Sequence, residues 1–154
     1  IKNMIKLICD IHKNITIKSE TLNLYKIILE KRKFMKYLLI EYPKCSTCKN
    51  AEKFLKENGI NFESRNIVTE TPTIEELKIW IEKSKLPIKK FFNTSGLLYK
   101  SMNLKEEIKK LTDDEKIVML ASNGMLIKRP ILIEIETGNV LLGFKQEEWK
   151  KIKK

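Results

Sequence analysis

The sequence lacks the long apolar run that a membrane-spanning helix requires. No hydrophobic stretch approaches the roughly 18 residues needed to cross a bilayer. The N-terminus also lacks the apolar segment and small-residue cleavage site of a secretory signal peptide. We therefore expect a cytoplasmic protein with no membrane partner.

Cysteine and histidine are scarce, with three cysteines and one histidine in the chain. Three cysteines cannot form the disulfide framework of a small secreted protein, and in a reducing compartment paired cysteines are more often catalytic or metal-binding than structural. His12 stands near Cys9, but two potential ligands cannot close a tetrahedral zinc site alone. We expect no bound metal and no bound cofactor.

Acidic residues are the minority, with 20 Asp and Glu against 31 Lys and Arg, which gives a formal net charge of +11. The basic excess is spread along the chain and is not gathered in one cluster. This distribution favours a solvated, lysine-rich surface over a nucleic-acid footprint. Direct nucleic-acid binding is therefore not expected.

The chain divides at Met35, which stands immediately before the first strand-like run. We interpret residues 1–34 as an N-terminal extension that is not part of the core. The remaining residues 35–154 are long enough to bury one hydrophobic core. They are predicted to form a single domain.

The first half of this domain alternates between strand and helix patterns. Gly59 ends the first helix, and Thr73 with Glu76 forms a T-x-x-E capping box that begins the second. The two strands are short runs bounded by turn residues. The predicted elements are, in order, strand 36–42, helix 48–58, strand 61–68 and helix 73–84.

The second half begins with a lysine-rich stretch and ends with a hairpin. Thr112 and Glu115 form a second capping box, and Asn123-Gly124 is the stop signal of the helix that follows it. Residues 137–139 (Thr-Gly-Asn) connect two strands as a hairpin turn. The predicted elements are short helices 89–92 and 97–102, helix 112–122, strands 131–136 and 140–144, and helix 146–154.

This order predicts an α/β fold in which a small mixed sheet is flanked by helices on both faces. The terminal hairpin supplies the antiparallel part of the sheet. The short helices of the middle segment form a helical insert.

Cys45 and Cys48 are the residues whose spacing points most directly to chemistry. They follow a strand and open a helix, where unpaired N–H groups and the helix dipole favour a thiolate. We predict that Cys45, the more exposed of the pair, is the nucleophile, and that Cys48 resolves its mixed disulfide. Lys44 and Lys49 add positive potential. The alternatives are half of a zinc site and two inert reduced thiols.

Arg129-Pro130 is the second candidate site and precedes a strand far along the chain. A proline there interrupts the hydrogen-bonded ladder and can hold a cis peptide beside the loop that carries Cys45, which we call the thiol loop. Arg129 can clamp an oxyanion or a substrate carboxylate with its planar fork and can steady the Cys45 thiolate. The alternative is a surface arginine that merely precedes a strand.

Four motifs in this order resemble the ArsC/Spx family, the glutaredoxin-type arsenate reductases and their relatives. They are YPKCSTCKNA at residues 42–51, FESRNI at 62–67, FNTSG at 92–96 and LIKRPI at 126–131. The resemblance implies a thioredoxin/glutaredoxin-like fold with a helical insert. It places the family's nucleophilic cysteine on Cys45 and its arginine before a cis proline on Arg129-Pro130.

The resemblance implies an arsenate reductase-like thiol-disulfide oxidoreductase whose electron donor is glutathione or a glutaredoxin or thioredoxin partner. Asn93, and roughly Lys145, fall where true arsenate reductases carry a second and a third oxyanion-binding arginine. Cys48 is a second cysteine that most of those enzymes lack. A small thiol, a glutathione mixed disulfide or a protein disulfide is therefore expected to suit the site better than arsenate.

The alternative function comes from the same resemblance. Spx is a redox-sensing transcriptional regulator that binds RNA polymerase and uses its C-x-x-C motif as a switch. Its acidic, glycine-containing linker is replaced here by residues 85–90 (KLPIKK). This difference weighs against the polymerase contact without removing the switch.

Overall fold

A computed structural model describes residues 36–152. The extension predicted for residues 1–34, including Cys9 and His12, lies outside this range, as do the last two residues. Among the helices that the structure describes, none is long and apolar enough to cross a membrane.

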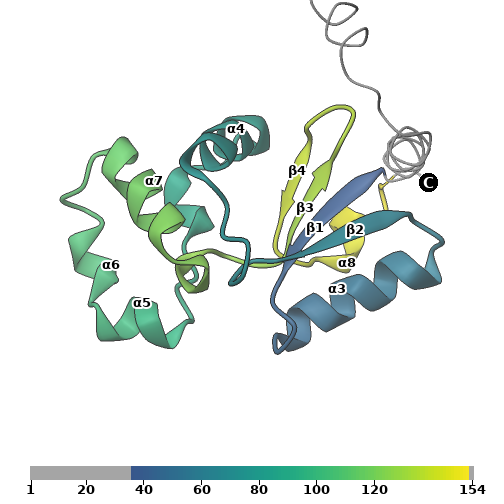
Figure 1. Ribbon diagram of the computed structural model, residues 1–154, viewed down its shortest axis with the longest axis horizontal. Coiled ribbons are helices and arrows are strands. Elements are labelled where there is room, and N and C mark those ends of the chain that lie inside the picture. The colour runs from purple at the N-terminus through teal and green to yellow at the C-terminus, as the bar shows by residue number, and fades with distance from the viewer. Residues whose placement is uncertain (1–35, 153–154) are drawn as a thin grey trace, which may run out of the picture. The chain divides into compact units, whose positions relative to one another are not determined.

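A four-stranded mixed sheet with the order β2-β1-β3-β4 forms the centre of the domain (Figure 1). β1 runs parallel to β2 and antiparallel to β3, and β3 and β4 pair as an antiparallel hairpin. The predicted small mixed sheet is thus confirmed. The strands are β1 (Tyr37–Glu41), β2 (Phe62–Asn66), β3 (Ile131–Glu134) and β4 (Val140–Leu142).

Side chains of the central strands alternate between the two faces of the sheet. Leu39 pairs with Leu132, and both pack into one core cluster. Their neighbours Ile40 and Ile131 also pair, and both pack into the other. All four are almost fully buried. The apolar run of β1 therefore serves two cores at once.

One face of the sheet is covered by α3 (Ser46–Glu57) and α8 (Gln146–Trp149). Ala51 and Leu55 of α3 pack beside Trp149, which is fully buried. The Trp149 ring N–H donates to the Gly143 carbonyl at 3.1 Å, so its one polar atom is satisfied. This face fixes α3, the helix that follows the thiol loop.

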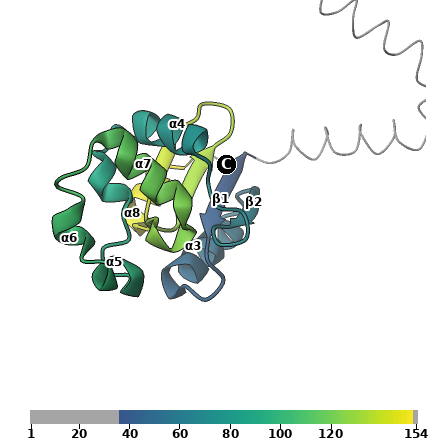
Figure 2. The same cartoon turned by 60° about the vertical axis from the view of Figure 1, so that its left-hand side comes forward.

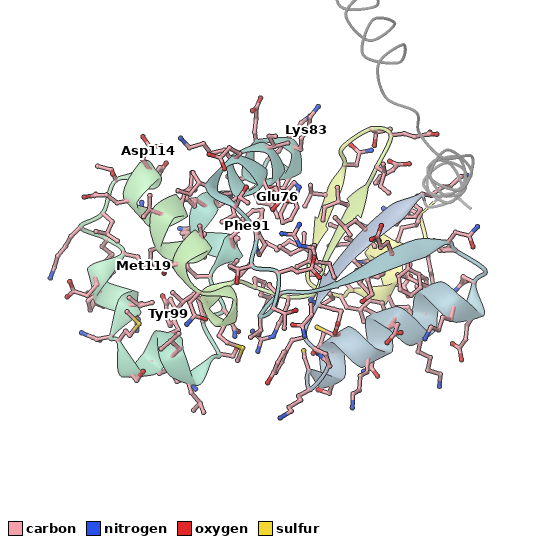
Figure 3. The ribbon with its side chains drawn as sticks, viewed as in Figure 1. Glu76, Lys83, Phe91, Tyr99, Asp114 and Met119 are labelled. Carbon is pink, nitrogen blue, oxygen red and sulfur yellow. The ribbon has the colours of Figure 1, made fainter. Side chains whose placement is uncertain are left out.

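The other face is covered by α4, α7 and the predicted helical insert (Figure 2). Phe91 and Tyr99 are buried there and lie within the cluster of helices (Figure 3). The elements are α4 (Ile74–Ser84), η1 (Ile88–Phe91), α5 (Leu97–Ser101), α6 (Leu104–Glu107), α7 (Asp113–Ser122) and η2 (Gly124–Leu126), where η1 and η2 are 3₁₀ helices.

Both predicted capping boxes are present. The Thr73 hydroxyl accepts from the Glu76 N–H, and the Glu76 carboxylate accepts from the Thr73 N–H. Thr112 and Glu115 repeat the pattern at α7. Glu76 also accepts two hydrogen bonds from Arg65 of β2, at 2.6 and 3.0 Å, which joins the start of α4 to the sheet.

Several element boundaries differ from the sequence prediction. The first helix begins at Ser46 because Cys45 caps it, and the last ends at Trp149, well before residue 154. Both hairpin strands are shorter than predicted, since the Glu134 carboxylate accepts from Thr137 and Asn139 and starts the turn. The short helix α6 was not predicted.

Gly124 has a different role from the one that the sequence suggested. α7 does end at Ser122, with Asn123 as its C-cap, as predicted. Gly124 lies beyond that end, and a Cβ on it would come within 1.9 Å of the Ile67 carbonyl oxygen. Glycine is required here by close approach to the loop after β2.

We predict that Gly124→Ala lowers the free energy of unfolding by about 2 kcal/mol or more, because backbone must shift to admit the methyl group. Chemical denaturation measures the change. Gly59→Ala is the control: it has open space around a φ of +65°, so it should cost only about 1 kcal/mol of backbone strain. Equal losses would contradict the packing argument.

Candidate functional site

Cys45 occupies the N-cap of α3. Its backbone is extended, with φ −91° and ψ 118°, and its sulfur accepts a hydrogen bond from the Cys48 N–H at 3.4 Å. The Cys45 N–H donates to the Tyr42 carbonyl at 2.9 Å, which fixes the turn between β1 and the helix. The half-buried sulfur therefore lies at the positive end of the helix dipole.

Cys48 lies in the first turn of α3 and is 1% exposed. Burial, together with the neighbouring Cys45, raises the pKa of the Cys48 thiol to about 12, even though a hydrogen bond with the Tyr42 backbone and the charge of Arg129 lower it. Cys48 is thus a protonated thiol at neutral pH. Neither cysteine is in a disulfide.

The environment of Cys45 acts in the opposite direction. Burial alone would raise the pKa of the Cys45 thiol, but hydrogen bonds from the Cys48 side chain and N–H outweigh this effect together with Arg129. The pKa of Cys45 is consequently lowered. The pKa values of the two neighbouring thiols are therefore displaced in opposite directions.

Arg129 and Pro130 lie beside the thiol loop, and the peptide bond between them is cis, as predicted. The Arg129 guanidinium carbon lies 5.1 Å from the centre of the Tyr42 ring, in a cation–π arrangement. Its Nε and Nη1 atoms are buried and have no hydrogen-bond partner within residues 36–152. Sequence reasoning missed Tyr42 as the support of Arg129, although its position before Pro43 in the thiol loop was a signal.

Cys45 and Arg129 line a common pocket of about 290 Å³, which we call the thiol pocket. Its charged lining residues are all cationic, namely Lys128, Arg129 and Lys145. The other lining residues are Thr47, Asn93, Ser95, Leu142, Gly143 and Phe144. A pocket with this charge favours an anionic ligand next to the sulfur.

Asn93 and Lys145 both line the thiol pocket, so the positions expected for further arginines lie around the same pocket as Cys45. The Asn93 amide donates to the Met125 carbonyl at 3.3 Å and therefore supports the loop. The Lys145 ammonium forms an ion pair with Glu148 at 2.8 Å. Arg129 is the one arginine in the lining.

A metal centre receives no support from the described part of the chain. No group of three or more His, Cys, Asp or Glu side chains in residues 36–152 could hold a metal ion. Cys45 and Cys48 have no further ligand of these kinds beside them there.

Comparison with protein families identifies the fold. Residues 40–152 match the model of the ArsC family. This chain belongs to the ArsC family. The thioredoxin-like α/β fold implied by the four motifs is confirmed by the mixed sheet and by solved ArsC-related structures.

Curated relatives include proteins without an assigned activity and regulators. The uncharacterized protein YusI of Bacillus subtilis is 47% identical over 108 residues, which cover 70% of this chain and 90% of YusI. The regulatory protein MgsR of Bacillus subtilis is 31% identical over 113 residues, covering 73% of this chain and 86% of MgsR. Global transcriptional regulators named Spx match at 23% to 27% identity.

Solved structures of ArsC family members share the fold. An ArsC family related protein from Bacteroides fragilis is 51% identical, with a TM-score of 0.74, and covers 78% of this chain and 99% of its own. A protein from Streptococcus mutans described as a possible arsenate reductase is 37% identical, with a TM-score of 0.68, covering 75% of this chain and 98% of its own.

We predict that Arg129→Gln raises the pKa of Cys45, because it removes the positive charge and the charged guanidinium donor that favour the thiolate. Alkylation of Cys45 should then become slower at neutral pH, and its pH profile should move to higher pH. Mass spectrometry of the Cys45 peptide measures the rate. Lys49→Gln, a change at an exposed flanking lysine, is the control; an equal shift in both variants would refute a specific role of Arg129.

Proposed function

We propose that this protein is a thiol-disulfide oxidoreductase of the arsenate reductase-like type that uses Cys45 and Cys48 as its dithiol. The observation that carries the proposal is the contrast between the two thiols. Cys45 caps a helix with a lowered pKa, whereas Cys48 is buried with a raised pKa. Arg129 stands in the same pocket as the nucleophile.

In the first step, the Cys45 thiolate attacks one sulfur of a disulfide substrate. A Cys45–substrate disulfide forms, the substrate S–S bond breaks, and the leaving sulfur departs as a thiolate that takes a proton from solvent. Arg129 and the positive end of α3 stabilise the attacking thiolate. The unpartnered N–H groups of Arg129 can also receive a carboxylate of the substrate.

In the second step, Cys48 resolves the mixed disulfide. Once Cys45 is bonded to substrate, it carries no negative charge, so one cause of the raised pKa of Cys48 is removed. The Cys48 thiol can then lose its proton and attack the Cys45 sulfur. The products are a Cys45–Cys48 disulfide and the second substrate thiol, so the dithiol has given up two electrons and two protons.

The catalytic cycle closes when an external thiol reduces the Cys45–Cys48 disulfide. We propose glutathione, or a protein of the glutaredoxin or thioredoxin class, as the donor. Glutathione carries carboxylates that suit the cationic lining of the thiol pocket. No bound cofactor is needed, because all electrons pass through sulfur.

Arsenate is a weaker candidate substrate for this site. A tetrahedral dianion requires several charge-assisted donors, and arginine forks supply them best. The Asn93 amide is neutral and is bonded to the Met125 carbonyl, and the Lys145 charge is already paired with the Glu148 carboxylate. The resemblance to arsenate reductases therefore extends to the thiol chemistry more firmly than to the oxyanion.

We predict that Cys45→Ser reduces turnover of a glutathione mixed disulfide by at least about a thousandfold, because the nucleophile is lost. Cys48→Ser should instead accumulate the Cys45–substrate disulfide, which intact-mass spectrometry detects. Arsenate, assayed in parallel with glutathione and glutaredoxin, should be reduced only weakly. Unchanged turnover by Cys45→Ser would contradict the assignment of Cys45 as the nucleophile. Robust arsenate reduction that depends on Cys45 would contradict the ranking of arsenate as the weaker substrate.

A redox-controlled regulator is the second candidate function, and the identity to the regulatory protein MgsR favours it. In this case the Cys45–Cys48 disulfide changes the affinity for a partner, which the resemblance to Spx identifies as RNA polymerase. Pull-down with oxidised and reduced protein distinguishes the candidates. Recovery of polymerase subunits with oxidised protein alone favours the regulator, and absence of polymerase from both samples favours the enzyme.

A further inference from the structure

A second hollow adjoins the thiol pocket. It has a volume of about 540 Å³ and shares Lys128, Leu142 and Lys145 with the thiol pocket. We call it the lysine groove. Because three residues line both hollows, the lysine groove lies next to the pocket that holds the Cys45 sulfur.

The floor of the lysine groove is apolar and belongs to the helical insert. Phe92 and Tyr99 are 1% and 7% exposed, and their ring centres lie 6.1 Å apart. Ile108 and Leu86 extend this lining. The two rings are buried, and Leu86, which is 39% exposed, supplies accessible apolar surface in the groove.

The charges of the lysine groove have a single sign. Its charged lining residues are Lys89, Lys90, Lys128 and Lys145, and no acidic side chain lines it. Of these, only Lys145 forms an ion pair within residues 36–152. Four ammonium groups around an apolar floor are complementary to a ligand that is both anionic and apolar.

Another hollow of similar size shows that this charge pattern is not general. That hollow lies at the turn end of the β3–β4 hairpin and has a volume of about 550 Å³. Glu134 and Glu148 line it together with Lys83 and Lys151, so its charges balance. Figure 3 shows Lys83 on α4 beside this hairpin. The lining of the lysine groove thus has an excess of positive charge that the lining of this other hollow lacks.

The lysine groove is firmly joined to the segment that carries Arg129. The Lys128 N–H donates to the Phe91 carbonyl at 2.6 Å, and the Asn93 N–H donates to the Leu126 carbonyl at 2.7 Å. Phe92 and Ile127 lie between them as an antiparallel bridge. These backbone contacts therefore fix the position of the groove lining relative to Arg129.

We propose that the lysine groove binds an acidic peptide segment next to the reactive cysteine of a protein disulfide. The inference rests on the proposed oxidoreductase function and names its substrate class. The substrate sulfur bonds to Cys45, an apolar side chain packs against Leu86, and carboxylates lie near Lys89 and Lys90. Flexible ammonium groups can follow carboxylates spaced along a chain, whereas fixed phosphates are best matched by arginine forks.

Matched peptide substrates test the proposal. Three peptides that differ only at two positions beside the cysteine, as Glu, Gln or Lys, are each prepared as a mixed disulfide with the same small thiol. We expect kcat/KM to be about tenfold higher for the Glu peptide than for the Gln peptide at low salt, and lowest for the Lys peptide. The preference should weaken as ionic strength rises.

Variants connect the preference to the groove. The double variant Lys89→Gln with Lys90→Gln should reduce the Glu-to-Gln ratio of kcat/KM to near one. Turnover of 2-hydroxyethyl disulfide, measured for every variant, provides the internal reference. The matched control is Lys100→Gln with Lys105→Gln, two exposed lysines that do not line the groove, and it should keep the full ratio.

Each remaining outcome contradicts the proposal in a recognisable way. If kcat/KM is equal for the Glu and Gln peptides, the proposed peptide site is wrong. The same holds if the preference survives in the Lys89 and Lys90 double variant. Neither result contradicts the oxidoreductase function. If a coenzyme A mixed disulfide is preferred, the Glu peptide is not, and the preference depends on Lys89 and Lys90, then the groove binds a phosphorylated thiol and the peptide proposal is wrong. If the wild type does not reduce even 2-hydroxyethyl disulfide, both the oxidoreductase function and the peptide site are contradicted.

Discussion

The hydrogen bond from the Cys48 N–H to the Cys45 sulfur is the interaction on which the site depends. It makes a cysteine the cap of α3, so the sulfur takes the place that serine, threonine or aspartate usually fills. The same turn of helix that exposes Cys45 to the thiol pocket buries Cys48 in the core. One local structure thus produces both the lowered and the raised thiol pKa.

The rest of the domain holds the partners of this cap in place. β1 delivers the chain to the cap, and the antiparallel pairing of β1 with β3 brings Arg129 beside it from far along the sequence. Tyr42 supports the guanidinium by a cation–π contact. α3 and α8 on one face, and the helical insert on the other, leave an opening lined with cations at the thiol end of the sheet.

Much of this arrangement was predictable where the signal is local. The capping boxes, the dithiol at a helix start and the hairpin depend on residues a few positions apart, and the structure contains all of them. Strand ends and the short helix α6 depend on tertiary packing, which no short window of sequence reports. The contact of Tyr42 with Arg129, and the lysines that meet in one groove, join segments distant in sequence. Asn93 and Lys145 were placed correctly as pocket residues only through the family resemblance.

Disulfide mapping after mild oxidation tests the central claim most directly, because it asks whether the two thiols act as a pair. Reduced protein is treated with a stoichiometric amount of diamide, digested and analysed by mass spectrometry without reduction. The account predicts a single new species that contains the Cys45–Cys48 disulfide. The account would be contradicted if Cys48 were still a free thiol after diamide treatment, whether or not Cys45 had been oxidised.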